Sequence, residues 1–156
     1  MRRVDPGHFR SVMGNFATGV TVITATAPAG PVGMTANAVA SLSLEPLLLL
    51  VAFDNTARTL QVVRETERFG VNVLGAGQEE LARLFASKAP EDAKFAGVPH
   101  TVHDGLPVIT GSIAWVGCRL ERLVDGGDHT IGIGAVESAE AGDGRPLLWF
   151  RGGYRS

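Results

Sequence analysis

Residues 33–46 read GMTANAVASLSLEP and run directly into the apolar segment 47–53, LLLLVAF. The first of these, which we call the small-residue segment, is rich in alanine and contains no lysine or arginine. Its uncharged polar side chains are Thr35, Asn37, Ser41 and Ser43. Small-molecule sites combine an apolar wall with a few placed polar groups. The segment therefore fits two interpretations, a ledge that binds a flat ligand with polar edges or a partly exposed strand with a polar face.

The length and composition of the chain indicate how many domains it forms and which partners are not expected. It has 156 residues, of which 45% are hydrophobic and 19% charged, and its formal net charge is −2. A chain of this length buries about 70% of its unfolded surface, which is enough for one core, so we expect a single domain over residues 1–156. The balanced charge predicts neither a nucleic acid nor a membrane surface as a partner.

The cysteine content and the N-terminus indicate the compartment. Cys118 is the only cysteine, so no intrachain disulfide can form, and its apolar neighbours predict a buried thiol. The four histidines are scattered and predict no metal site. The first residues, MRRVDP, lack the apolar core of a signal peptide, and no apolar run approaches the roughly 18 residues of a membrane span. We therefore expect a cytoplasmic protein.

Hydrophobic periodicity predicts three helices. Apolar residues at helical spacing predict the first over about residues 6–17, ended by Gly19. Asp54-Asn55-Thr56 can cap a second helix that runs to about Arg64. The third is expected over Gln78 to Ser87.

Strand patterns outnumber the helical ones. The turn at residues 28–31 predicts a hairpin between strand 20–24 and the small-residue segment, and the continuous apolar run 47–53 is typical of a strand buried on both faces. Further strands are expected at residues 69–74, 113–124, 129–139 and 147–150. The last three follow one another without crossover helices, which favours antiparallel pairing. The predicted fold is a mainly β, antiparallel barrel with peripheral α-helices, in which residues 88–107 show no regular pattern.

The start of the second predicted helix can be interpreted in two ways. N–H groups at a helix N-terminus, the Thr56 hydroxyl and the Arg58 guanidinium together suit a phosphate group. Ordinary capping by Asp54 or Thr56 explains the same residues, and the Asp54 charge would repel an anion. Ser87 and Lys88, after the third helix, could add to a phosphate site or be solvated.

Two glycine-containing segments near the C-terminal strands also have alternatives. Gly127-Asp128-His129 could present His129 to a nicotinamide ring, or could be only a hairpin turn. Gly132-Ile133-Gly134 lies inside a strand, where its glycines indicate a bulge or close backbone approach rather than a dinucleotide-binding loop. At the chain end, Tyr154 could line a cofactor pocket, or its aromatic neighbours could close the barrel or a subunit interface.

Taken together, these segments resemble the flavin reductase-like family, and the resemblance covers the chain from about Phe9 to Arg155. The segments that carry it are GVTVIT at 19–24, the small-residue segment, NTART at 55–59, FGVNVL at 69–74, GDH at 127–129 and FRGGYR at 150–155. The resemblance implies an FMN-binding split β-barrel of Greek-key type and a homodimer. It also implies NAD(P)H-dependent reduction of FMN or FAD, with the reduced flavin supplied to a partner monooxygenase.

The resemblance further implies roles for individual residues. Those expected at the flavin ring and ribityl chain are Met34, Thr35, Ala36, Asn37, Ala38, Ser41, Leu42 and Ser43. Asn55, Thr56 and Arg58 are expected to hold phosphate, with Ser87 and Lys88 as further flavin contacts. Gly127, Asp128 and His129 are expected to bind the nicotinamide nucleotide, with His129 orienting the ring. Tyr154 is expected to approach the flavin or nicotinamide, and no protein group is expected to act as a nucleophile.

Three hypotheses follow for function. The first is a flavin reductase that oxidises NADH or NADPH only when free flavin is present. The second is an electron carrier with tightly held FMN and little NAD(P)H activity, and the third is a barrel that acts only as an interaction module. The sequence leaves open the choice between FMN and FAD, the choice between NADH and NADPH, and the identity of the partner monooxygenase.

Overall fold

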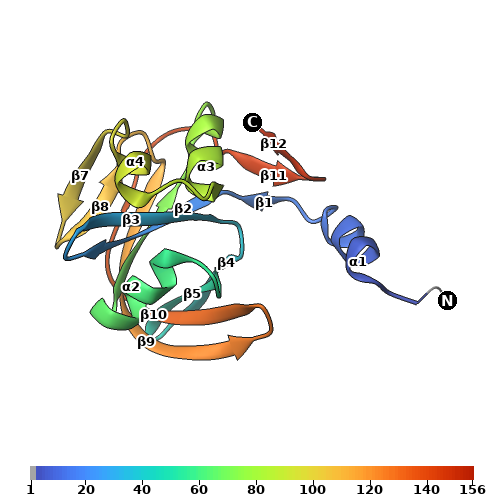
Figure 1. Cartoon of the computed structure of the whole chain (residues 1–156), viewed down its shortest axis with the longest axis horizontal. Coiled ribbons are helices and arrows are strands. Elements are labelled where there is room, and N and C mark those ends of the chain that lie inside the picture. The colour runs from blue at the N-terminus through green and yellow to red at the C-terminus, as the bar shows by residue number, and fades with distance from the viewer. Residues whose placement is uncertain (1–2) are drawn as a thin grey trace.

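The computed structural model describes residues 3–156 and shows a β-barrel with helices around it (Figure 1). The strands of the barrel sheet are β2 (Thr21–Ala27), β3 (Gly30–Ala36), β4 (Val39–Leu44), β5 (Leu47–Asp54), β6 (Arg68–Val73), β9 (Ala114–Gly126) and β10 (His129–Ala141). Smaller sheets contain β1 (Thr18–Gly19), β7 (His100–His103), β8 (Leu106–Ile109), β11 (Leu148–Phe150) and β12 (Gly153–Arg155). The helices are α1 (Pro6–Met13), α2 (Arg58–Thr66), α3 (Glu79–Ala86) and α4 (Glu91–Phe95).

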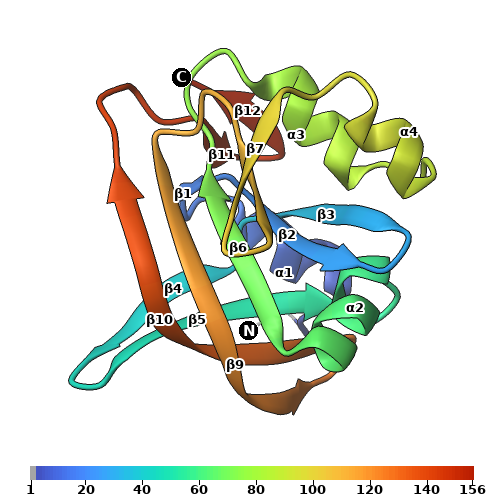
Figure 2. The same ribbon diagram turned by 90° about the vertical axis from the view of Figure 1, so that its left-hand side faces the viewer.

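The barrel sheet is closed by its chain connection. Its strand order is β3-β2-β6-β9-β10-β5-β4 with every pair antiparallel, so β3 and β4 are the two edges although they are consecutive in sequence. In a flat sheet these edges would be about 29 Å apart, since neighbouring strands are about 4.8 Å apart. Only Asn37 and Ala38 connect them, a span of at most about 11 Å. The sheet must therefore curl into a barrel with an open seam (Figure 2).

The expectation of a mainly β, antiparallel split barrel with peripheral helices is thus confirmed, including the β2–β3 hairpin. The expectation that residues 47–53 are buried on both faces is wrong. In β5, Leu49, Val51 and Phe53 are buried, whereas the residues between them are only half-buried. Both faces of this strand carry apolar side chains, but the face that points away from the barrel is only partly covered.

Two glycines of β10 allow aromatic rings to fill the barrel. A Cβ at Gly132 would lie 2.7 Å from the Phe53 ring, and one at Gly134 would lie 2.7 Å from the Phe69 ring. These two phenylalanines pack edge to face, with ring centroids 5.8 Å apart, and the β9–β10 register shifts between Ile133 and Gly134. The interpretation of these glycines as sites of bulging and close approach is confirmed.

The C-terminal strands do not all belong to the barrel. β9 and β10 pair as expected, but β11 pairs with β1 and β12 in a separate sheet, because the chain leaves the barrel after β10. Residues 88–107, for which no pattern was found, contain α4, β7 and the start of β8. α3 and α4 lie beside β3 (Figure 2).

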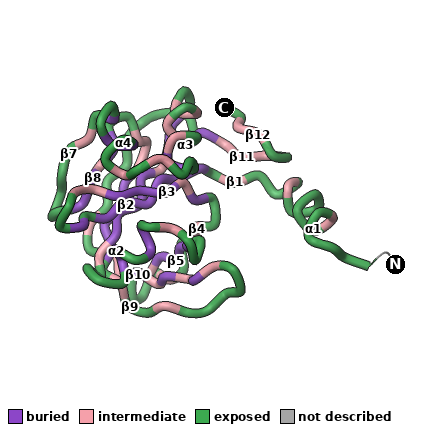
Figure 3. Tube along the Cα trace, in the orientation of Figure 1, coloured by how far each residue is buried: buried purple, intermediate pink, exposed green. Residues whose placement is uncertain are grey.

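Helix α1 is shorter than expected and lies apart from the barrel. It ends at Met13 and is followed by Gly14, so the expectation that it reaches residue 17 is wrong. None of its residues is buried (Figure 3). Its apolar residues Phe9, Val12 and Met13 are exposed. Its C-terminal end is held at the β11–β12 turn, where Arg151 donates from Nε to Asn15 Oδ1 at 3.0 Å. Within residues 3–156, no helix has the length and apolar character needed to span a membrane.

Candidate functional site

Three of the predicted site segments converge on the Asp54 carboxylate, at the end of β5. Thr56 donates to Asp54 Oδ1 from its backbone N–H at 2.8 Å and from its hydroxyl at 2.7 Å. These hydrogen bonds are the main cause of a lowered Asp54 pKa, which partial burial opposes and the nearby charges of His129 and Lys88 support. The fold therefore places His129 directly opposite Asp54 in the β5–β10 ladder, with the positive charge of Lys88 close enough to act on the same carboxylate.

Asp54 was not among the predicted site residues, since the sequence suggested only a helix cap. An aspartate that ends a strand and precedes Asn-Thr also fits a side-chain-to-backbone turn, and this is the role that Asp54 takes. That signal could have marked Asp54 as a turn residue. Asp54 lies near Lys88 and His129 only because of long-range packing, which the sequence around Asp54 could not have indicated.

Asn55 ties this turn to the turn before β10. Its backbone N–H donates to Asp128 O at 3.1 Å, and its Nδ2 donates to Gly127 O at 3.1 Å. Its Oδ1 accepts a hydrogen bond from the Thr130 hydroxyl at 2.6 Å. The Asn55 side chain thus positions the Gly127–His129 turn, a role that differs from the phosphate contact expected for it. Thr130 is a further supporting residue that the sequence did not indicate.

The start of α2 is available to an anion. The expectation that Asp54 or Thr56 caps this helix is wrong, because the N-cap residue is Ala57, which makes no side-chain capping bond. The free N–H groups of a first helical turn attract negative charge, and the exposed Arg58 is the first residue of the helix. The hydroxyl of the next residue, Thr59, is buried without a hydrogen-bond partner in the described part of the chain.

His129 begins β10 with its side chain 43% exposed. Its Nδ1 lies 2.8 Å from Asp128 Oδ1. An ionised carboxylate only accepts hydrogen bonds, so in this contact Nδ1 carries the proton. Nε2 is then the ring nitrogen left to face another group, which suits a histidine that orients a ligand at the barrel rim.

Ser87 and Tyr154 line a cavity of about 300 Å³. Its other lining residues are Arg83, Ala86, Trp149, Gly152 and Gly153. The Arg83 guanidinium lies 5.2 Å from the centre of the Tyr154 ring, and Trp149 packs edge to face on the same ring. Burial raises the pKa of the Tyr154 hydroxyl, and the Arg83 charge partly offsets this effect. The two predicted residues are therefore brought together in an aromatic pocket with a cation.

The small-residue segment is divided by the fold. Met34 and Ala36 are buried in β3, and the Thr35 hydroxyl donates to Ala82 O of α3 at 2.6 Å. Asn37 and Ala38 are exposed in the link across the seam. On β4, Ser41 and Leu42 are exposed and Ser43 is half-buried. The β3 half is thus occupied by internal contacts, and the link and β4 carry the accessible polar groups.

The donors around Asp54 fit the phosphate of a flavin nucleotide. Arg58 and Lys88 supply positive charge, and the uncapped start of α2 supplies N–H groups. The Asp54 charge, which would oppose an anion, is already stabilised by two hydrogen bonds from Thr56. The described residues include no cluster of histidine, cysteine, aspartate and glutamate that could hold a metal ion.

Comparisons with known proteins identify the family of the chain. The HsaB reductase subunit of a flavin-dependent monooxygenase from Mycobacterium tuberculosis is 43% identical over 156 residues, covering 97% of this chain and 82% of HsaB. A protein of Rhodococcus sp. named NADH-dependent flavin reductase is 36% identical over 157 residues, covering 98% of this chain and 87% of its own.

A solved structure of a flavin-dependent oxidoreductase is similar over the whole chain. The NADH:FAD oxidoreductase SgcE6 of Streptomyces globisporus, solved with NAD and FAD fragments, is 38% identical and superposes with a TM-score of 0.92 over 100% of this chain and 96% of its own. The family model described as the flavin reductase like domain matches residues 13–156. The chain therefore belongs to the flavin reductase-like family.

Proposed function

We propose that this protein is an NAD(P)H:flavin oxidoreductase that reduces FMN or FAD and releases the reduced flavin to a separate monooxygenase. The observation that carries the proposal is the convergence of residues 54–56 with the Gly127–His129 turn at the end of β5, held by the hydrogen bonds of Asn55 and by the pairing of His129 with Asp54. HsaB and its relatives are named as reductase components of monooxygenases, which supports the same assignment. We treat residues 1–156 as one functional domain.

In this assignment, hydride passes from the nicotinamide to the flavin, and the protein binds and orients both. The exposed link and β4 contact the flavin ring and ribityl chain through Asn37, Ala38, Ser41, Leu42 and Ser43, with Met34, Thr35 and Ala36 as the backbone beside them. The phosphate is held by Arg58 and the α2 N-terminus, with Thr56, Asn55, Ser87 and Lys88 around it. Gly127, Asp128 and His129 hold the nicotinamide, and Tyr154 walls the adjoining pocket.

We infer that the protein acts as a homodimer in the cytoplasm. The apolar side chains of Phe9, Val12, Met13 and Phe16 are exposed on and after α1, and an isolated helix gains little from exposing such a face. A second copy of the chain would cover them. The cytoplasmic location is supported by the use of NADH as hydride donor and by the single unpaired Cys118.

The dimer is tested by light scattering. Phe9→Asp should shift the mass from dimer to monomer, because a charge would replace an apolar contact. Val102→Asp is the matched control, since Val102 is 66% exposed on β7, and it should leave the mass unchanged. A monomeric wild-type protein at micromolar concentration would contradict the proposal.

The activity is tested by NADH oxidation with and without added flavin. The proposal predicts oxidation that requires free FMN or FAD, and crossing both flavins with NADH and NADPH identifies the preferred pair. A yellow protein that is reduced only slowly by NADH would favour the carrier hypothesis. Failure to oxidise either nicotinamide with either flavin would refute the reductase.

The role of His129 is tested within the same assay. His129→Ala should raise the KM for NADH about tenfold while leaving the flavin dissociation constant within twofold. His103→Ala provides a matched control, because His103 is 55% exposed on β7, a strand outside the barrel sheet. Equal losses of NADH and flavin binding in His129→Ala would remove the role assigned to this side chain.

A further inference from the structure

Thr130 is the second residue of β10 and directly follows His129. Side chains alternate between the two faces of a strand, so these two residues point to opposite sides of the barrel wall. Thr130 is 3% exposed, whereas the His129 side chain is 43% exposed. Thr130 can therefore fix the position of its ligand-facing neighbour from inside the barrel.

The Thr130 hydroxyl sets the orientation of the Asn55 amide. It donates to Asn55 Oδ1 at 2.6 Å, and on the other side of the amide Nδ2 donates to Gly127 O at 3.1 Å. An amide carries its acceptor on one side and its donors on the other, so a flip of the group would bring its oxygen against the Gly127 carbonyl. One buried hydroxyl thus selects the amide orientation that holds the turn.

Asn55 is the tie between the turn before β10 and the end of β5. Its backbone N–H donates to Asp128 O at 3.1 Å, and its side chain makes the two bonds described above. Apart from strand pairing, no other hydrogen bond within the described chain joins residues 127–130 to another segment. The position of His129 at the barrel rim therefore depends on Asn55.

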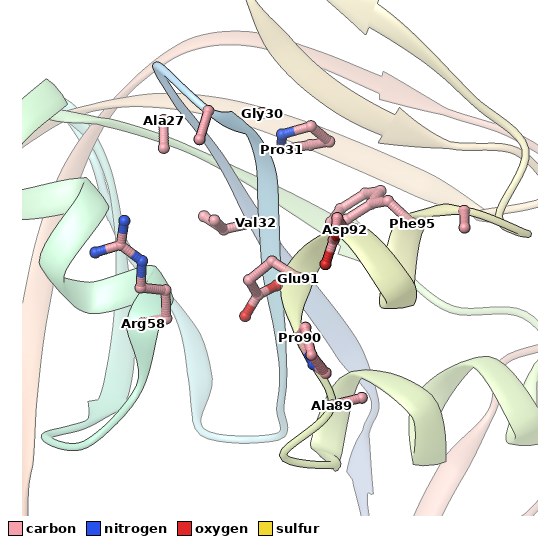
Figure 4. A pocket seen from close by; sticks show the side chains of 12 residues that line it. Ala27, Gly30, Pro31, Val32, Arg58, Ala89, Pro90, Glu91, Asp92 and Phe95 are labelled. Carbon is pink, nitrogen blue, oxygen red and sulfur yellow. The ribbon is translucent and has the colours of Figure 1, made fainter.

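The same asparagine directly precedes the proposed phosphate site. Asn55 is followed by Thr56 and Ala57, and α2 begins at the exposed Arg58. Figure 4 shows the Arg58 side chain reaching from α2 to the edge of a groove. A phosphate bound at this helix start would hold the backbone of residues 55–58 in place. Asn55 then carries that restraint to the turn before β10.

We propose that Thr130 is a positioning residue, and that through Asn55 it couples the flavin site to the nicotinamide site, so that each cofactor binds more tightly when the other is bound. The inference rests on the proposed reductase function. Ordering of the α2 start and of the turn before β10 costs conformational entropy, and the first ligand to bind has already ordered both segments for the second. Such coupling is reciprocal, so flavin and nicotinamide raise each other's affinity by the same factor.

The test measures flavin dissociation constants by flavin fluorescence, with and without saturating NAD⁺, which occupies the nicotinamide site without reducing the flavin. FMN is compared with riboflavin, which has the same ring system and no phosphate. Direct stacking of the nicotinamide on the flavin ring affects both flavins equally. The coupling that passes through the α2 start is therefore the difference between them. In the wild type, NAD⁺ should tighten FMN binding about fivefold more than riboflavin binding.

Thr130→Val keeps the shape of the side chain and removes the hydroxyl. It should reduce the extra tightening of FMN to less than about twofold, and raise the KM for NADH several-fold with little change in kcat. Thr130→Ser retains the donor and should restore the wild-type coupling. Thr24→Val is the matched control, because the Thr24 hydroxyl is also buried and donates to a backbone carbonyl, Pro107 O at 2.8 Å. Thr24 lies on β2, which pairs with neither β5 nor β10, so this variant should lose stability and keep the coupling.

Retention of the full difference between FMN and riboflavin in Thr130→Val would overturn the inference. Equal tightening of the two flavins in the wild type, or the same loss of coupling in Thr24→Val as in Thr130→Val, would also overturn it. These outcomes are separable from failure of the proposed function. A wild-type protein that oxidises no NADH with either flavin refutes the reductase, whereas the binding titrations require no turnover.

Discussion

The two edge strands of the barrel, β3 and β4, are built from the same small-residue segment but have different surroundings. β3 is largely buried beside α3 and α4, and its Gly33 N–H and Thr35 hydroxyl bond to Glu91 and Ala82 of these helices. β4 is mostly exposed, and Leu44 at its end is 82% exposed. An unpaired strand edge offers free N–H and C=O groups, so the covered edge is structural and the open edge is available for binding.

The largest effect that separates the two edges is expected from Gly33→Val. The new Cβ would lie 2.8 Å from the Phe85 ring, which is buried and packs edge to face on Phe95. The loss should be about 1 to 3 kcal/mol in the free energy of unfolding, measured with urea. The matched Ala40→Val on exposed β4 should stay within about 0.5 kcal/mol of wild type. Equal losses of unfolding free energy in the two variants would contradict the distinction between a covered β3 edge and an open β4 edge.

Loss of one hydroxyl on each edge is expected to have a smaller effect. Thr35→Val removes the donor to Ala82 O and should cost about 1 kcal/mol of unfolding free energy. The flavin affinity of this variant should equal that of wild type. Ser41→Ala should leave stability within about 0.5 kcal/mol and raise the KM for flavin several-fold. If Ser41→Ala instead lowered stability as much as Thr35→Val, β4 would be a structural edge too.

The two edge strands show how much of the fold could be predicted from the sequence alone. The hairpin, the strand patterns and the turn residues are local signals, and they predicted the barrel. The split of residues 33–46 into a covered and an open half depends on α3 and α4, which pack from more than 40 residues away in sequence. No periodicity within the segment itself could have indicated it.

The candidate site shows the same limit. Its segments could be predicted from their polar and glycine residues. The role of Asn55 could not, because its side chain bonds to Gly127 and Thr130, which are far away in sequence. The helix cap was misassigned for a similar reason, since Asp54 bonds within its own turn and leaves α2 to begin at Ala57. Residue type predicted the location of the site, and packing decided which atoms remained available.

At the end of β5, beside the open edge, pH is expected to have a modest effect through Asp54. Because the Thr56 hydrogen bonds lower the Asp54 pKa below its usual 3.8, ionised Asp54 stabilises the fold at neutral pH. This contribution is lost as pH falls through the lowered pKa. Asp54→Asn should therefore be less stable than wild type at pH 7, with the difference narrowing at pH 3. Urea midpoints at both pH values measure this, and a constant difference would contradict the account.

The smallest functional effect is expected at Cys118, on β9 in the closed part of the barrel. Its thiol is fully buried, and burial raises its pKa to about 12. Iodoacetamide should leave the folded protein unlabelled at pH 8 and label it fully in denaturant, as mass spectrometry can show. Rapid labelling of the folded protein would indicate that the barrel opens between β6 and β9.

Turnover of free flavin tests the central claim most directly. Under anaerobic conditions, a trace of the protein is mixed with excess NADH and a large excess of FMN or FAD, and flavin reduction is followed by its absorbance. A reductase that releases its product should reduce many equivalents of flavin per protein molecule. Reduction that stops at one equivalent per protein, or does not occur, would contradict the account.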